Sequence, residues 1–118
     1  MYIQGFIVPV PGDKQEEYRK VASAFGQFAG EFGVIEIVEA WESDVPDGKL
    51  TDFRRAVNLE EGEKVVFSWV IWPDKATADG AHAKMMTDPR MQDFGEMPFD
   101  GKRMVIGGFE PIFSFGRE

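Results

Sequence analysis

Residues 64–72 form a run that is apolar on both of the faces that a β-strand presents. Successive side chains of a strand point to opposite faces of its sheet. One face of this run carries Val65, Phe67, Trp69 and Ile71, and the other carries Val66, Val70 and Trp72. Residues 2–10 are also apolar on both sides. A sheet with one face in water alternates apolar and polar side chains, so both faces of this sheet require a cover.

Hydrophobic periodicity and turn residues predict the other elements. Apolar side chains recur at steps of three and four between Tyr18 and Phe32, which predicts a helix. Asp13, with Glu16 three residues later, predicts the N-terminal cap of that helix. The predicted elements are strands over residues 2–10, 34–43, 64–72 and 104–115, and helices over residues 13–33 and 73–87.

This order of elements predicts a single domain over residues 1–118. Strand, helix, strand, strand, helix, strand is the ferredoxin-like βαββαβ plan of the α+β class, with a four-stranded antiparallel sheet and two helices on one face. Exposing the apolar side chains of the second face costs about 1.5–3 kcal/mol for each large residue. We therefore expect a homodimer in which two sheets pair as a dimeric α+β barrel. The alternative is a monomer whose connection at residues 44–63 folds over the sheet.

Composition excludes several classes of function. The chain has 13 basic and 21 acidic residues, a net charge of −8, which opposes binding to nucleic acid. No apolar run approaches the roughly 20 residues that span a bilayer, and the N-terminal residues lack the pattern of a signal peptide. There is no cysteine for disulfides or thiolate metal sites. We expect a cytoplasmic protein with no membrane or nucleic-acid partner, no metal and no cofactor.

Several motifs carry a resemblance to a known family. They are Val8-Pro9-Val10-Pro11, Asp44-Val45-Pro46-Asp47-Gly48-Lys49, Asp88-Pro89-Arg90 and Met97-Pro98-Phe99-Asp100-Gly101-Lys102-Arg103-Met104. With them the chain resembles, over nearly its whole length, the YbaA-like family of small bacterial proteins of unknown function. The resemblance implies the fold of the dimeric α+β barrel superfamily and a homodimer. It implies no reaction and no catalytic residue. Neighbours in that superfamily include cofactor-independent monooxygenases and lactone isomerases.

Glu39 is the first candidate for catalysis. It shares a strand face with Ile35, Ile37 and Trp41, and this alternation directs its carboxylate toward an apolar space. A carboxylate that loses its water there has a raised pKa and can act as a general base. The alternative is a carboxylate at the mouth of the barrel, either solvated or paired with an arginine.

His82, the single histidine, is the second candidate. Helical spacing places it beside Ala78, Ala81 and Met85, near the buried flank of the second predicted helix. There it can transfer protons near neutral pH, or it can be a packed structural side chain. One histidine without cysteine gives no zinc site.

Aromatic and basic side chains supply the candidates for ligand binding. Trp41 and Trp69 can line a pocket for a flat apolar molecule, and they can also be ordinary core residues. Arg90, Lys102 and Arg103 can form an anion-binding rim, or the arginines can pair with nearby acids in turns.

These observations leave three functions open. The first is a homodimeric barrel that binds a small apolar or aromatic molecule. The second is a cofactor-independent enzyme of the monooxygenase or isomerase kind, which uses Glu39 or His82. The third is a structural or protein-interaction dimer with a filled barrel. Whether the chain is an enzyme stays open at this stage.

Overall fold

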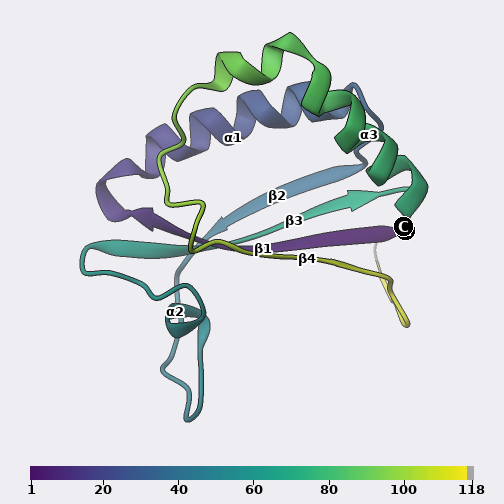
Figure 1. The fold of residues 1–118 in the computed structure, drawn as a ribbon. Helices are drawn as coiled ribbons and strands as arrows, with labels where there is room; N and C mark the ends of the chain where they lie inside the picture. Colours follow the sequence, from purple (N-terminus) through teal and green to yellow (C-terminus); the bar gives the residue numbers. More distant parts are fainter. Residues whose placement is uncertain (117–118) are drawn as a thin grey trace.

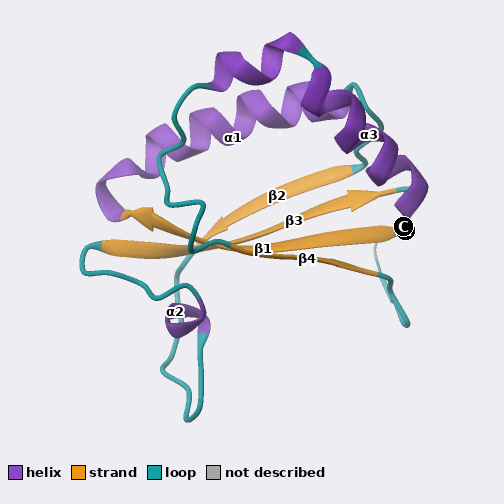
Figure 2. Ribbon diagram, viewed as in Figure 1, coloured by secondary structure: helices purple, strands orange, loops and turns teal. Residues whose placement is uncertain are grey.

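A four-stranded antiparallel sheet with two long helices along one face forms the body of the molecule (Figure 1, Figure 2). The computed structural model describes residues 1–116. Its strands are β1 (Tyr2–Pro11), β2 (Glu36–Trp41), β3 (Glu63–Trp72) and β4 (Val105–Phe109), its α-helices are α1 (Gln15–Gly30), α2 (Phe53–Ala56) and α3 (Lys75–Thr87), and its 3₁₀ helices are η1 (Gly12–Lys14) and η2 (Pro89–Phe94). The expected α+β class and the antiparallel sheet are confirmed.

The strands lie in the order β2-β3-β1-β4, and each pair of neighbours is antiparallel. β1 and β3 are the central strands, and their register runs from Tyr2 opposite Trp72 to Pro11 opposite Glu63. Their side chains therefore form the middle of each sheet face.

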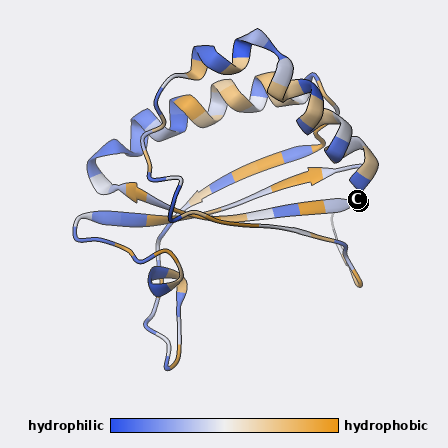
Figure 3. Cartoon of the chain, viewed as in Figure 1, coloured by the Kyte–Doolittle hydropathy of each residue, from blue (hydrophilic) through white to orange (hydrophobic). Residues whose placement is uncertain are grey.

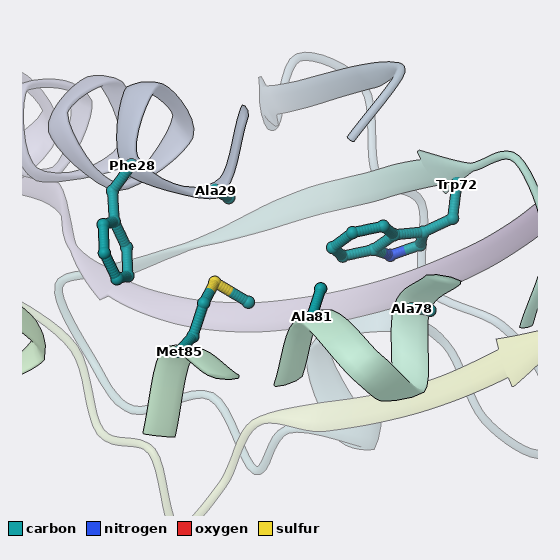
Figure 4. Close-up of a cluster of buried hydrophobic side chains, with 6 residues drawn as sticks. All are labelled: Phe28, Ala29, Trp72, Ala78, Ala81 and Met85. Carbon is teal, nitrogen blue, oxygen red and sulfur yellow. The ribbon is translucent and has the colours of Figure 1, made fainter. Parts of the chain in front are cut away.

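The helix-covered face contains the core. One cluster of buried side chains joins α1, β3 and α3, and Figure 4 shows its members: Phe28, Ala29, Trp72, Ala78, Ala81 and Met85. Ala78 and Ala81 carry only methyl groups, so α3 approaches the indole ring of Trp72 closely. A second cluster lies toward the start of α1 and consists of Val8, Val10, Tyr18 and Val66.

The two long helices begin differently. Asp74 caps α3, because its Oδ1 accepts a hydrogen bond from the backbone N–H of Thr77 at 2.7 Å. The predicted Asp13 cap of α1 is wrong. Asp13 lies inside the 3₁₀ turn that precedes the helix, and Lys14 occupies the cap position without a side-chain hydrogen bond. A backbone hydrogen bond from Gly12 N to Gly62 O, 2.8 Å long, fixes this turn against the start of β3.

β4 is shorter than the sequence predicts. The expected strand over residues 104–115 ends at Phe109, which lies opposite Ile3 of β1. β1 begins at Tyr2, so it has almost no backbone left to pair with the chain beyond this point, and Pro111 has no N–H to donate. Residues 110–116, here called the tail, leave the sheet. In the tail Ile112, Phe113 and Phe115 are between 83% and 101% exposed.

The sheet face opposite the helices is apolar and largely open. We call it the open face; its residues are Ile3, Ile7, Phe67, Trp69, Ile71, Val105 and Phe109. They line a shallow groove of about 570 Å³. Figure 3 shows apolar residues distributed along the strands, and Figure 1 shows α2 and the tail on the side away from α1 and α3. The connection that contains α2 covers one end of this face, where Phe53 packs edge-on against Phe67.

Candidate functional site

Glu39 and Tyr18 form a hydrogen-bonded pair between β2 and α1. The register places Glu39 opposite Ser68 of β3, on the face that the helices cover. Tyr18 projects from α1, and its phenol oxygen donates a hydrogen bond of 2.7 Å to Glu39 Oε1. Tyr18 is buried, whereas the Glu39 side chain is exposed on one side. Glu39 therefore lies between the helices and the sheet of one subunit, rather than between two sheets.

The surroundings of the pair set its protonation. Burial raises the pKa of Glu39, and hydrogen bonds from Tyr18 and Ser68 lower it by a smaller amount. Burial, together with the charge of Glu39, raises the pKa of Tyr18, so the phenol stays protonated and remains a donor. Among residues 1–116 no basic side chain forms an ion pair with Glu39. The pair is thus a carboxyl group held by a neutral donor.

Glu39 separates two hollows. The inner cavity, of about 220 Å³, lies between α1 and the sheet and has an almost entirely apolar lining. Its polar lining residues are Tyr18, Glu39 and Ser68, and its apolar ones are Phe6, Val8, Val21, Ala22, Phe25, Ile37, Val70, Met97, Phe99 and Met104. The outer cleft, of about 580 Å³, opens toward the start of α1. Both hollows are lined by Tyr18, Ala22, Ile37 and Glu39, so the carboxyl group borders both the outer cleft and the apolar lining of the inner cavity.

A second polar group lies next to the inner cavity. Trp72 Nε1 donates to Gln4 Oε1 at 2.8 Å, and the amide nitrogen of Gln4 lies 3.3 Å from His82 Nε2. Since an indole N–H only donates, the amide of Gln4 presents its N–H to His82, whose Nε2 accepts. These three residues line a hollow of about 370 Å³ that shares four lining residues with the inner cavity: Phe6, Phe25, Ile37 and Val70.

The tryptophans do not gather into one pocket. Trp41 packs near the Tyr18 cluster and lines the outer cleft on the helix side. Trp69 lies on the open face, where its indole N–H donates to Glu36 Oε2 at 2.9 Å. Trp41 and Trp69 therefore lie on opposite faces of the sheet and cannot contact the same small molecule within one subunit.

The basic candidates lie on separate elements. Arg90 binds both carboxylate oxygens of Glu31 at 3.0 Å and also pairs with Asp88. Arg103 binds Glu63 at 2.7 Å and Asp100 at 2.9 Å. Lys102 is exposed in the turn that begins at Asp100.

The pairs of Arg90 and Arg103 also set the charge of their partners. Hydrogen bonds from Arg103 hold the pKa of Glu63 below its ordinary value, and those from Arg90 do the same for Asp88. The structure thus gives both arginines carboxylate partners and does not bring them together into a rim.

Sequence reasoning missed three residues of the site. Tyr18 is buried, as its place on the apolar helix face predicts, but its hydroxyl group also binds Glu39. Ser68 and Gln4 carry the signal that could have identified them, because each is a polar residue on an otherwise apolar strand face. Within residues 1–116 no group of three histidine or acidic side chains is placed to hold a metal ion, and no helix there is long and apolar enough to cross a membrane.

Comparison with known proteins identifies a matching protein family and several relatives. The family model described as "Protein of unknown function (DUF1428)" matches residues 1–101. The chain is 59% identical over 112 residues to the protein named "Uncharacterized protein YbaA" of Escherichia coli strain K12, which covers 94% of this chain and 96% of the relative. The proteins of the same name from Escherichia coli O157:H7 and Shigella flexneri have the same identity and coverage.

Proposed function

The chain belongs to the DUF1428 family of proteins of unknown function and is YbaA-like, and we propose that it binds a small, largely apolar molecule in the inner cavity. The observation that carries this proposal is the cavity lining, which is apolar apart from one tyrosine, one glutamate and one serine. Binding sites for small molecules combine an apolar lining with a few polar groups that orient the ligand. Pockets for drug-sized ligands occupy roughly 300–1,000 Å³, so a cavity of about 220 Å³ fits a molecule with one or two rings.

Propylbenzene is a suitable first probe, because it is apolar and has a single ring. We expect calorimetry or ligand-observed NMR to detect its binding to the wild-type protein. Ala22 lines the cavity, so Ala22→Leu fills part of it and weakens binding at least tenfold. Ala24→Leu is the matched control, since Ala24 is exposed on the same helix. The proposal fails if the wild-type protein does not bind the probe or if both variants bind it equally well.

The open face supports a proposal about assembly. The order of the sheet and the two long helices on one face fit a ferredoxin-like subunit, and we assign the open face to pairing with the same face of a second copy, as a dimeric α+β barrel. Its exposed apolar side chains include Phe67 (44%), Val105 (40%) and Phe109 (60%). Burying each of them stabilises the assembly by up to about 1.5–3 kcal/mol. The exposed apolar tail, which continues from the same edge strand, adds to this surface.

Light scattering tests the dimer. We expect twice the subunit mass of 13.3 kDa at micromolar concentration. Phe67 is 44% exposed on the open face, so Phe67→Glu places a charge on the proposed interface and gives monomers. Met86→Glu is the control, because Met86 is exposed on α3, on the helix side of the sheet. A wild-type protein that scatters as a single 13.3 kDa subunit contradicts the assembly.

The enzyme alternative has one specific observation in its favour. A carboxyl group with a raised pKa, beside an apolar cavity and in contact with solvent, is placed to move a proton without a cofactor. This alternative requires that Glu39→Gln abolish turnover while the fold is kept. A structural or protein-interaction dimer with a filled barrel requires instead that none of the probes bind to the protein. The cysteine-free composition supports placing the protein in the cytoplasm.

A further inference from the structure

Resting on the proposed binding function, we infer that Glu39 selects the ligand class: a small aromatic amine whose ammonium group pairs with the carboxylate and whose ring occupies the inner cavity. This inference depends on the position of the Glu39 carboxyl group. Glu39 lies in the wall shared by the inner cavity and the outer cleft. A single molecule can therefore bury a ring on one side of Glu39 and keep a charged group at its oxygens.

The hydrogen bonds of Glu39 leave room for a ligand. Tyr18 donates to Oε1, and Ser68 is the other side chain that favours the ionised form. A carboxylate offers about four acceptor positions on its two oxygens. The hydroxyl groups of Tyr18 and Ser68 fix the orientation of the carboxylate, and neither neutralises it. An ammonium group brings both the missing positive charge and additional donors.

Two further acidic residues and one arginine line the outer cleft. Asp13 and Glu16 line the outer cleft and lie at the start of α1, where acidic side chains complement the positive end of the helix. Arg19 also lines the cleft, and its guanidinium group binds Glu16 at distances of 2.6 to 3.1 Å. Among the described residues, Glu39 is the acidic side chain that lines both the outer cleft and the inner cavity.

The lining of both hollows fits an aromatic cation. Tyr18 and Phe99 pack edge to face beside the inner cavity, with ring centroids 5.8 Å apart. Trp41 and Tyr18 line the outer cleft near the carboxylate. Aromatic faces attract cations, and an offset or edge-to-face arrangement accommodates a further ring. A neutral alcohol of the same shape fits the cavity equally well but lacks the charge that Glu39 pairs with.

The test compares three probes that differ in one group: 2-phenylethylamine, 2-phenylethanol and propylbenzene. We expect the wild-type protein to bind the amine at least tenfold more tightly than the other two at pH 7. In Glu39→Gln this preference disappears, while binding of propylbenzene is kept. Glu17→Gln is the control for loss of one negative charge, because Glu17 is exposed on α1 and lines neither hollow. Circular dichroism verifies the fold of each variant.

A pH titration of the wild-type protein provides a second test that needs no variant. Protonation of Glu39 removes the negative charge, so amine affinity falls on acidification through the pKa of Glu39, while propylbenzene affinity stays constant. The groups that face Glu39 are Tyr18 and Ser68, together with Asp13, Glu16 and Arg19 across the outer cleft. Equal affinity for amine and alcohol, or a preference that persists in Glu39→Gln, overturns the assignment of Glu39. Failure of all three probes overturns the cavity proposal itself.

Discussion

Tyr18 and Glu39 are joined by a 2.7 Å hydrogen bond from the phenol oxygen to Oε1, across the space between α1 and β2. β2 is an edge strand of the described sheet, and β3 is its neighbour there. The bond therefore ties the edge of the sheet to the helix layer at the point where the inner cavity and the outer cleft meet. It also keeps a carboxyl group beside an apolar space, with no basic partner among residues 1–116.

Glu39→Gln tests how much the Glu39 carboxyl group, in this position, lowers the free energy of unfolding. Burial raises the pKa of Glu39 in the folded state, so the folded chain retains a proton at pH values where the unfolded chain, with a pKa of about 4.3, has lost it. The free energy of unfolding therefore falls as the pH rises through this window. Glutamine does not titrate, so we expect the variant to gain stability relative to wild type as the pH rises from the unfolded-state pKa through the raised pKa of Glu39. The gain stays below about 1 kcal/mol, because Glu39 is partly exposed and solvent screens its charge.

Urea denaturation at a series of pH values measures that difference. Glu17→Gln, which removes an exposed acid from α1, is the control for the loss of one negative charge. An equal pH dependence of the Glu39→Gln variant and the wild type would show that burial does not perturb this carboxyl group.

Tyr18→Phe removes the donor and keeps the ring. Since the hydrogen bond from Tyr18 lowers the pKa of Glu39, we expect that pKa to rise further in the variant, and the acidic limb of amine binding to move to higher pH. The loss of one hydrogen bond costs about 0.5–1.5 kcal/mol of stability. Carbon-detected NMR titration of the Glu39 carboxyl group measures the shift. Tyr2→Phe removes the other tyrosine hydroxyl, on β1, and should leave this titration unchanged.

The central strands and the helices are the part of the fold that the sequence predicts best. Residues 2–10 and 64–72 are predicted as strands, and they match β1 and β3 within a residue or two at each end. The edges are harder to predict, because a strand ends where its partner ends. The tail has strand-like composition, yet β4 stops at Phe109, where β1 runs out of backbone to pair with it.

The candidate site, too, is predicted by the sequence only in part. Alternation places Glu39, Ile37 and Trp41 on one face of β2, and this is correct. Alternation does not say which face of the sheet the helices cover, and that choice puts Glu39 beside Tyr18 rather than between two subunits. Trp41 of β2 and Trp69 of β3 lie on opposite faces of the sheet. The sequence does not give the register between these two strands, so it could not predict that separation.

Gln4 offers a test of the second polar group. Trp72 is almost completely buried, and its indole N–H depends on Gln4 Oε1 as an acceptor. Gln4→Leu leaves this donor without its partner, so we expect a loss of about 1–3 kcal/mol in the free energy of unfolding. In a Trp72→Phe background no donor remains to be satisfied, and the same substitution should cost much less. A double-mutant cycle by chemical denaturation gives the coupling. A coupling near zero would show that the Gln4 amide does not support Trp72.

Met85 and Met86 are neighbours on α3 that test the packing of the core. Met85 is 4% exposed and belongs to the cluster around Trp72, whereas Met86 is 75% exposed. Met85→Ala should cost about 2–5 kcal/mol, because it leaves a cavity in the core. Met86→Ala should change stability by less than about 0.5 kcal/mol. Similar effects of the two substitutions would contradict the observed orientation of α3.

The tail should stabilise the proposed dimer without stabilising the subunit. Ile112, Phe113 and Phe115 contact little of their own chain, since each is at least 83% exposed. Such a run of apolar side chains gains free energy only by burial against another surface. A chain that ends at residue 110 should therefore keep its circular dichroism spectrum and show a dimer dissociation constant at least tenfold higher in sedimentation equilibrium. Met86→Ser, which removes an exposed apolar side chain from the helix side, should leave the constant unchanged. If the shortened chain dimerises as tightly as the full-length chain, the tail lies outside the interface and the open face alone must bury the apolar surface.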